Sequence, residues 1–111
     1  MFGHSINVSS KPIGSKCVID VFGVVRTPED SNLIKEEIES KLDSFDKFVI
    51  NIHDSFTFPA TTLGGCLRLM REQNIKIEIC YGDTQLLHLF DALRLVEQFN
   101  VQKIGQYGGA T

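Results

Sequence analysis

Four hydroxyl side chains lie between a buried strand and the helix that follows it, and they are the groups in this chain best placed for chemistry. Ser55, Thr57, Thr61 and Thr62 come after the apolar run 48–52, which is typical of a strand covered on both faces by helices. A hydroxyl at a helix start can cap backbone N–H groups, and the same N–H groups and the helix dipole favour a phosphate. Thr61 and Thr62 are therefore interpreted either as helix caps or as acceptors of a phosphoryl group.

Two phenylalanines, two glycines and an aspartate flank these hydroxyls. We expect one of Phe56 and Phe58 to face the core and the other to face outward, where an exposed ring could anchor a partner. Gly64 and Gly65 together cost roughly 2 kcal/mol of helix propensity relative to alanine, so we expect close backbone approach there, to a neighbouring strand or to a bound protein. Asp54 has no nucleophile or glycine-rich phosphate loop beside it, which favours a turn or partner contact over a general base.

The other candidates for catalysis or metal binding occur singly. The cysteines, each inside an apolar pattern and none in a CxxC pair, are Cys17, Cys66 and Cys80. This pattern favours reduced thiols packed as small hydrophobic groups. The histidines, which lie on separate elements without an i,i+4 partner, are His4, His53 and His88. We therefore predict no metal site, no cofactor and no catalytic centre.

Length and charge narrow the class of protein. The chain has 111 residues, and we expect a single domain over 1–111, with its core at about 5–104 and a loose tail at 105–111. The net charge of -3, with both signs mixed along the chain, provides no basic stripe for nucleic acid. No apolar run approaches the roughly 18 residues that a membrane span needs, and the N-terminus lacks a signal-peptide pattern, so we expect a cytoplasmic protein.

Turn and capping residues divide the first half of the chain into strands and a helix. The segments 4–8 and 17–25 predict a hairpin at a sheet edge, with turn residues over 9–15. The sequence Thr27-Pro28-Glu29-Asp30 predicts a capped helix start. The apolar positions that follow at helical spacing are Leu33, Ile34, Ile38, Leu42 and Phe45.

The second half continues the alternation of strands and helices. Isoleucines alternate with charged residues over 75–79 and predict a strand, and Gly82-Asp83-Thr84 predicts a turn and a helix cap. The apolar residues of the third helix are Leu86, Leu89, Phe90, Leu93 and Val96. A short strand is expected near 101–104. This order is that of an α/β domain whose later strands run parallel through helical crossovers.

The order of elements and four local sequences resemble the STAS family, whose members include bacterial anti-sigma factor antagonists and cytoplasmic domains of sulfate transporters. The resemblance covers about 5–104. It is based on Val21-Phe22-Gly23, on Val49-Ile50-Asn51-Ile52 with Asp54, on Thr61-Thr62-Leu63-Gly64 and on Leu89-Phe90-Asp91. It implies a mixed α/β sheet of about five strands, with an N-terminal edge hairpin, parallel later strands and three or four helices. A glycine that often breaks the third helix in antagonists is replaced by Arg94, so we expect that helix to run on.

The resemblance also implies a function. In the antagonists, an Asp-Ser-Ser-Gly sequence carries a serine that a partner kinase phosphorylates, and the same positions read Pro59-Ala60-Thr61-Thr62 here. The acceptor position falls on Thr61, with Thr62 as a second candidate, and three of the four residues depart. The implied protein is a non-enzymatic, bacterial, cytoplasmic regulator of transcription that binds an anti-sigma factor or serine/threonine kinase. The residues assigned to partner binding are Gly23, Asp54, Ser55, Phe56, Thr57, Phe58, Pro59, Ala60 and Gly64.

Two alternatives stay open at this point. A constitutive adaptor subunit of a transporter, lipid-trafficking or other multiprotein complex would bind its partners without phosphorylation, and Pro59 and Ala60 motivate this hypothesis. A small hydrolase or redox protein would use Cys66 or Cys80 and requires a reactive thiol. A homodimer is also left open, whereas nucleic-acid binding and membrane spanning are not expected.

Overall fold

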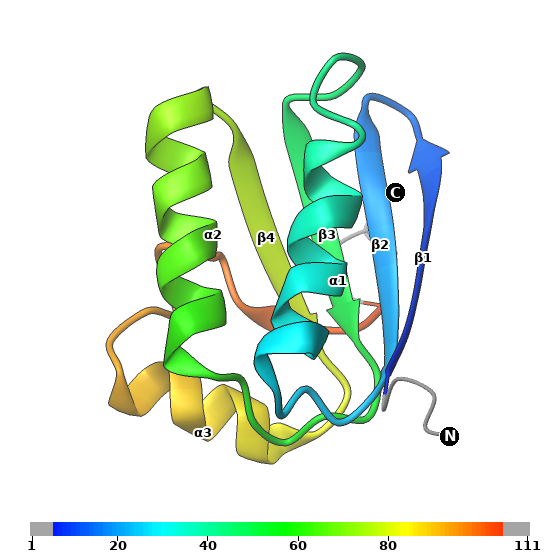
Figure 1. The fold of residues 1–111 in the computed structure, drawn as a ribbon. Coiled ribbons are helices and arrows are strands. Elements are labelled where there is room, and N and C mark those ends of the chain that lie inside the picture. The colour runs from blue at the N-terminus through cyan, green and yellow to red at the C-terminus, as the bar shows by residue number, and fades with distance from the viewer. Residues whose placement is uncertain (1–5, 106–111) are drawn as a thin grey trace.

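The computed structural model describes residues 6–105 and has a layer of helices packed on one face of a five-stranded sheet (Figure 1). The elements in chain order are β1 (Ile6–Ile13), β2 (Lys16–Gly23), α1 (Pro28–Glu39), β3 (Lys47–Ile52), α2 (Ala60–Gln73), β4 (Lys76–Tyr81), α3 (Thr84–Ala92) and β5 (Gln102–Lys103). The expected mixed α/β fold is confirmed. None of the helices in this described range is long and apolar enough to cross a membrane.

The strands lie in the order in which they occur along the chain. β1 pairs with β2 in an antiparallel hairpin, and each later neighbour is parallel, as expected. The hairpin turn is shorter than predicted, because Ile13 pairs with Lys16 and only Gly14 and Ser15 lie between the strands. Gly14 has a φ of 61°, a left-handed conformation that glycine adopts without steric cost. Lys11 and Pro12, which lie within the predicted turn segment 9–15, instead continue β1, where an edge strand tolerates proline.

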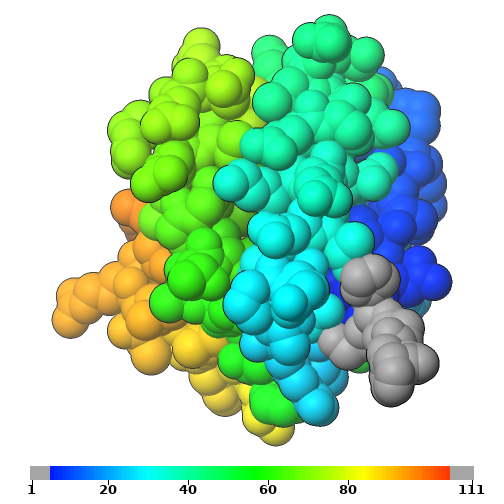
Figure 2. Space-filling model, in the orientation of Figure 1, coloured from blue at the N-terminus to red at the C-terminus, as the bar shows by residue number. Residues whose placement is uncertain are grey.

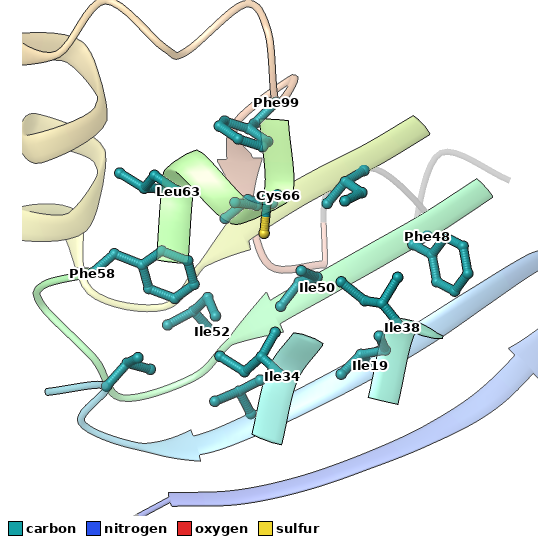
Figure 3. Packing of buried hydrophobic residues seen from close by; sticks show 14 of the residues in the cluster. Ile19, Ile34, Ile38, Phe48, Ile50, Ile52, Phe58, Leu63, Cys66 and Phe99 are labelled. Carbon is teal, nitrogen blue, oxygen red and sulfur yellow. The ribbon is translucent and has the colours of Figure 1, made fainter. Parts of the chain in front are cut away.

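The core lies between the sheet and the helices. Ile19, Ile50 and Ile52 point from the strands toward Ile34 and Ile38 of α1 (Figure 3). α2 contributes Leu63 and Cys66 to the same cluster. Near α3, the ring of Phe90 contacts those of Phe58 and Phe99. In the space-filling view α1 and α2 lie side by side and cover most of the sheet (Figure 2).

The opposite side of the sheet, called the outer face below, is not covered by any of the described helices. Val18, Val49 and Cys80 form a second, smaller cluster on this face, with Ile104 packed against them. The expectation that helices cover both faces of the central strand is therefore wrong for the described residues. Side chains on a strand point alternately to the two faces. The charged and polar residues two positions before or after Val18, Val49 and Cys80 on the same strands therefore also point to the outer face.

Two helices end earlier than their apolar patterns predict. The Thr27 capping box is confirmed, but α1 ends at Glu39, and turns carry Leu42 and Phe45, which still pack against the core. α3 ends at Ala92, before Val96, so the expectation that it runs on is wrong. Arg94 itself adopts a φ of 60° and takes the left-handed conformation that a glycine would supply.

Candidate functional site

The hydroxyl-bearing segment 53–59, called the hydroxyl loop below, joins β3 to α2 at the carboxyl edge of the parallel strands. In open α/β sheets, this edge is where strand-to-helix loops gather and where binding sites form. The loop between β2 and α1 reaches the same edge (Figure 1). The first turns of α1 and α2 therefore start close to each other.

Two side chains of the hydroxyl loop hold the β2–α1 connection in place. Asp54 accepts a hydrogen bond from the Gly23 N–H at 2.9 Å, and Ser55 Oγ accepts one from the Val25 N–H at 3.0 Å. Ser55 Oγ also donates to the Thr57 carbonyl at 2.6 Å. Gly23 has a φ of 101°, a conformation that favours glycine. Ser55 is fully buried, so its hydroxyl has a structural role and does not face a partner.

The two phenylalanines of the loop face in opposite directions, as expected. Phe58 is 4% exposed and packs against Phe90 with ring centroids 6.2 Å apart, whereas Phe56 is 44% exposed. A large exposed ring in an ordered loop is the kind of group that anchors a protein contact.

Neither threonine at the start of α2 caps the helix. The N-cap is Pro59, whose side chain makes no capping hydrogen bond, and there is no acidic residue in the first turn. The helix-cap interpretation of Thr61 and Thr62 is therefore wrong. The Pro59 carbonyl accepts the Thr62 and Leu63 N–H groups. The Ala60 and Thr61 N–H groups have no side-chain cap within the described residues.

The two threonines differ in accessibility. Thr61 is exposed, whereas Thr62 is 6% exposed and its hydroxyl forms a buried hydrogen bond with the Ser31 hydroxyl of α1. A phosphoryl group on Thr62 would break this bond and bring a double negative charge into a buried position, which is costly without a paired cation. The accessible hydroxyl at the helix start is that of Thr61.

A groove with a volume of about 200 Å³ separates α1 from α2. Thr61, Thr62 and Lys35 line it together with apolar atoms of Ile34 and Leu69. The exposed Thr61 hydroxyl therefore shares this groove with the Lys35 cation and with apolar side chains.

The expected close approach at the two α2 glycines is not found within the chain. A Cβ added at Gly64 or Gly65 would meet no atom within 4 Å, and Gly64 is exposed while Gly65 lines the groove. The strand alternative is therefore wrong, and approach by a bound protein stays a prediction.

The three thiols are buried. Burial raises the pKa of Cys66 to about 12 and, with Glu78 nearby, that of Cys80 to about 11, and it also raises the pKa of Cys17. All three cysteines are free. A nucleophilic thiol needs a lowered pKa and access to solvent, so the geometry does not support the hydrolase or redox alternative.

The outer face carries a polar cluster that the sequence patterns did not predict. His53 Nε2 and Asp20 Oδ1 lie 2.8 Å apart, Asn51 Nδ2 donates to the same oxygen at 3.2 Å, and the His53 ring stacks on Phe22 at 4.2 Å. The strand register could have predicted this cluster, because Asp20 of β2 pairs with Asn51 of β3. No group of three potential metal ligands occurs among the described residues.

Two solved structures share this fold. An anti-sigma factor antagonist from Mycobacterium paratuberculosis superposes with a TM-score of 0.71 at 13% sequence identity, over 88% of this chain and 86% of that chain. An uncharacterized protein with a SpoIIAA-like fold from Shewanella loihica superposes with a TM-score of 0.54 at 15% identity, over 93% of this chain and 87% of that chain. No protein-family model matches the chain, and no curated protein matches it significantly.

At these identities the likeness concerns the fold. The chain has a STAS-like fold, with the edge hairpin and parallel later strands that the sequence resemblance implied.

Proposed function

We propose that this chain with a STAS-like fold is a non-enzymatic regulatory module of the cytoplasm that binds a protein partner through the hydroxyl loop and the start of α2. In this proposal Thr61 is the phosphoacceptor that switches binding. The observation that carries it is the contrast between the two threonines, because Thr61 is exposed at an uncapped helix start while Thr62 is buried against Ser31.

The surroundings of Thr61 suit a phosphoryl group. The uncapped first turn of α2 provides backbone N–H groups and the positive end of the helix dipole, which favour an anion. Lys35 lines the same groove and adds a cation to the neighbourhood. The fold can therefore accept the modification without unfolding.

The switch itself would be electrostatic. A phosphothreonine carries about -1.5 to -2 charges at neutral pH, and an interface that closes over it must desolvate those charges. The unmodified surface offers the exposed Phe56 ring and the open backbone of Gly64 as neutral contacts. We expect the unmodified chain to bind its partner and the modified chain to be released.

A constitutive adaptor is the second candidate, and the sequence before Thr61 favours it. Pro59 and Ala60 stand where the antagonists have Asp and Ser, so a kinase that reads those side chains would lose two contacts. An adaptor would use the same surface in a stable complex and would carry no phosphate.

The test combines capture with designed variants. The tagged chain is captured from its native cells, and mass spectrometry identifies co-purifying proteins and any phosphate on the Thr61 peptide. The binding of the identified partner is then measured for wild type, Thr61→Ala and Thr61→Glu. Thr84→Glu is the matched control, because it places the same charge on an exposed threonine at the start of α3.

The outcomes separate the two candidates. The switch predicts phosphate on Thr61, near-normal binding by Thr61→Ala, and at least roughly tenfold weaker binding by Thr61→Glu but not by Thr84→Glu, a difference of about 1.4 kcal/mol. An unmodified peptide and equal binding by all variants would reject the switch in favour of the adaptor.

A further inference from the structure

Each of the three central strands begins with a lysine. Lys16 opens β2, Lys47 opens β3 and Lys76 opens β4. Lys47 and Lys76 are direct partners in the parallel register, and the pairing of Cys17 with Phe48 places Lys16 one residue back, opposite Lys47. The three lysines therefore form one row across adjacent strands, although they are 31 and 29 positions apart in the sequence.

The row belongs to the outer face of the sheet. Val18, Val49 and Cys80 form the outer cluster, and Lys16, Lys47 and Lys76 stand two or four residues before them on the same strands. Because side chains alternate between faces, all three lysines point to the side away from α1 and α2.

This arrangement concentrates positive charge with little compensation. Neighbouring strands are about 4.8 Å apart, and like charges directly opposite each other destabilise a sheet. The acidic partner of Lys16 is Glu78, two residues after Lys76 on β4. Its Oε1 lies 3.5 Å from Lys16 Nζ, and its Oε2 accepts a hydrogen bond from Asn100 at 3.0 Å. Lys47 and Lys76 form no ion pair within residues 6–105.

The lysines also line a hollow. Its volume is about 130 Å³, and its walls are Lys16, Lys47, Phe48, Lys76 and Glu78. Pockets for drug-sized ligands begin at roughly 300 Å³, so this hollow suits a single small group.

We propose that the lysine row is a binding site for a phosphate monoester or inorganic phosphate. A dianion offsets the charges of both Lys47 and Lys76, whereas a carboxylate offsets one. Ammonium groups bind phosphate as mobile point charges, and three flexible lysine side chains from adjacent strands can converge on one tetrahedral group. The phosphate can come from a free anion or from a phospholipid headgroup.

The site is independent of the proposed switch. It lies at the amino edge of the parallel strands, whereas the hydroxyl loop and Thr61 lie at their carboxyl edge. Failure of one proposal therefore leaves the other standing.

The first test is a titration of the full chain with inorganic phosphate at low ionic strength. Amide chemical shifts measured by NMR monitor the binding. We expect saturable shifts at the starts of β2, β3 and β4, and affinity at least roughly tenfold lower in Lys47→Gln/Lys76→Gln, since two of three charges are lost. Arg68→Gln/Arg71→Gln is the matched control, because it removes two exposed cations from α2 and should leave the affinity unchanged.

The second test distinguishes the sources of the phosphate. Vesicles of phosphatidylcholine with or without phosphatidic acid, which carries a phosphomonoester headgroup, are sedimented with wild type and both double variants. Binding that requires phosphatidic acid and the lysines assigns a lipid headgroup, whereas saturation by inorganic phosphate without vesicle binding assigns a free anion.

The proposal has clear contrary outcomes. It is overturned if wild type shows neither saturable shifts with phosphate nor vesicle binding. It is also overturned if Arg68→Gln/Arg71→Gln loses as much affinity for phosphate as Lys47→Gln/Lys76→Gln. Single variants Lys47→Gln and Lys76→Gln repeat the test if the double variant fails to fold. Lys47→Arg/Lys76→Arg keeps the charge and should retain binding within a few-fold.

Discussion

The Ser31 hydroxyl of α1 and the Thr62 hydroxyl of α2 form a hydrogen bond that spans the groove between the two helices. Both residues are buried, with Ser31 9% and Thr62 6% exposed. Each hydroxyl is the other's side-chain partner, so the bond connects the helix that carries Thr61 to the helix that carries Lys35. Removing one partner leaves the other hydroxyl buried and unpaired.

The first prediction concerns this bond. Thr62→Val keeps the side-chain shape but leaves the Ser31 hydroxyl unpaired, and we expect the free energy of unfolding to fall by about 1–3 kcal/mol. Urea denaturation measures it. Ser31→Ala/Thr62→Val should lose less than the sum of the single variants, and Thr61→Val, at the exposed neighbour, should change stability by less than about 0.5 kcal/mol. Additive losses would mean that the two hydroxyls are not coupled.

The second prediction separates the glycines of α2 from Gly82. Gly64→Ala should raise the free energy of unfolding by about 1 kcal/mol, because an added Cβ meets no atom and alanine favours the helix. Gly82→Ala should lower it by about 1–3 kcal/mol, because its Cβ would lie 2.3 Å from the His53 carbonyl oxygen. Thermal unfolding compares the two variants.

The variant Gly64→Ala also tests whether a partner binds against the start of α2. If Gly64 is kept small for a bound protein, Gly64→Ala should weaken partner binding while stabilising the fold. A stabilised variant with unchanged affinity would show that the partner does not approach the helix backbone at this position.

The third prediction uses the left-handed conformation of Arg94. For a residue with a Cβ this conformation costs roughly 1–2 kcal/mol, so Arg94→Gly should stabilise the fold by about 0.5–1 kcal/mol after the added flexibility of glycine in the unfolded chain. Asn74 has a similar φ of 54° and serves as the control. Asparagine tolerates this region, so Asn74→Gly should gain less. Equal gains would point to a general effect of glycine.

The fourth prediction concerns pH. Burial disfavours the charged form of Asp20, but hydrogen bonds from His53 and Asn51 outweigh it, so the pKa of Asp20 is lowered from its ordinary value of 3.8. A lowered folded-state pKa stabilises the protein above pH 3.8, and this contribution is lost as the pH falls through the folded pKa. Wild type should therefore lose stability relative to Asp20→Asn below pH 3.8. Urea denaturation measures the free energy of unfolding of both proteins across this pH range. A constant difference between wild type and Asp20→Asn would contradict the prediction.

Local sequence signals predicted most of the fold. The Thr27 capping box, the Asp83 cap and the apolar runs of the strands each depend on neighbours within a few residues, and the structure confirms them. The boundaries that failed depend on longer range. Leu42 and Phe45 reach the core from turns at positions that also fit a helix, so periodicity could not distinguish the two.

The features of the candidate sites were less predictable because they arise from pairing between elements. Thr61 and Thr62 are equivalent in the sequence, and only the packing of α1 against α2 buries one of them. The lysine row illustrates the same limit. The mixed charges along the chain indicate no basic stripe, yet three strands that each begin with a lysine align those residues once they pair in parallel.

The two edges of the sheet have a consequence for self-association. The outermost strand of the hairpin carries Lys11 and Pro12, which oppose strand addition because a charge repels its own copy and proline has no N–H to donate. The other edge, β5, has only the two residues Gln102–Lys103. Within residues 6–105, neither edge suits the edge-to-edge pairing that leads to fibrils or domain swapping, which favours a helix or a sheet face of this range as the docking surface for a second copy.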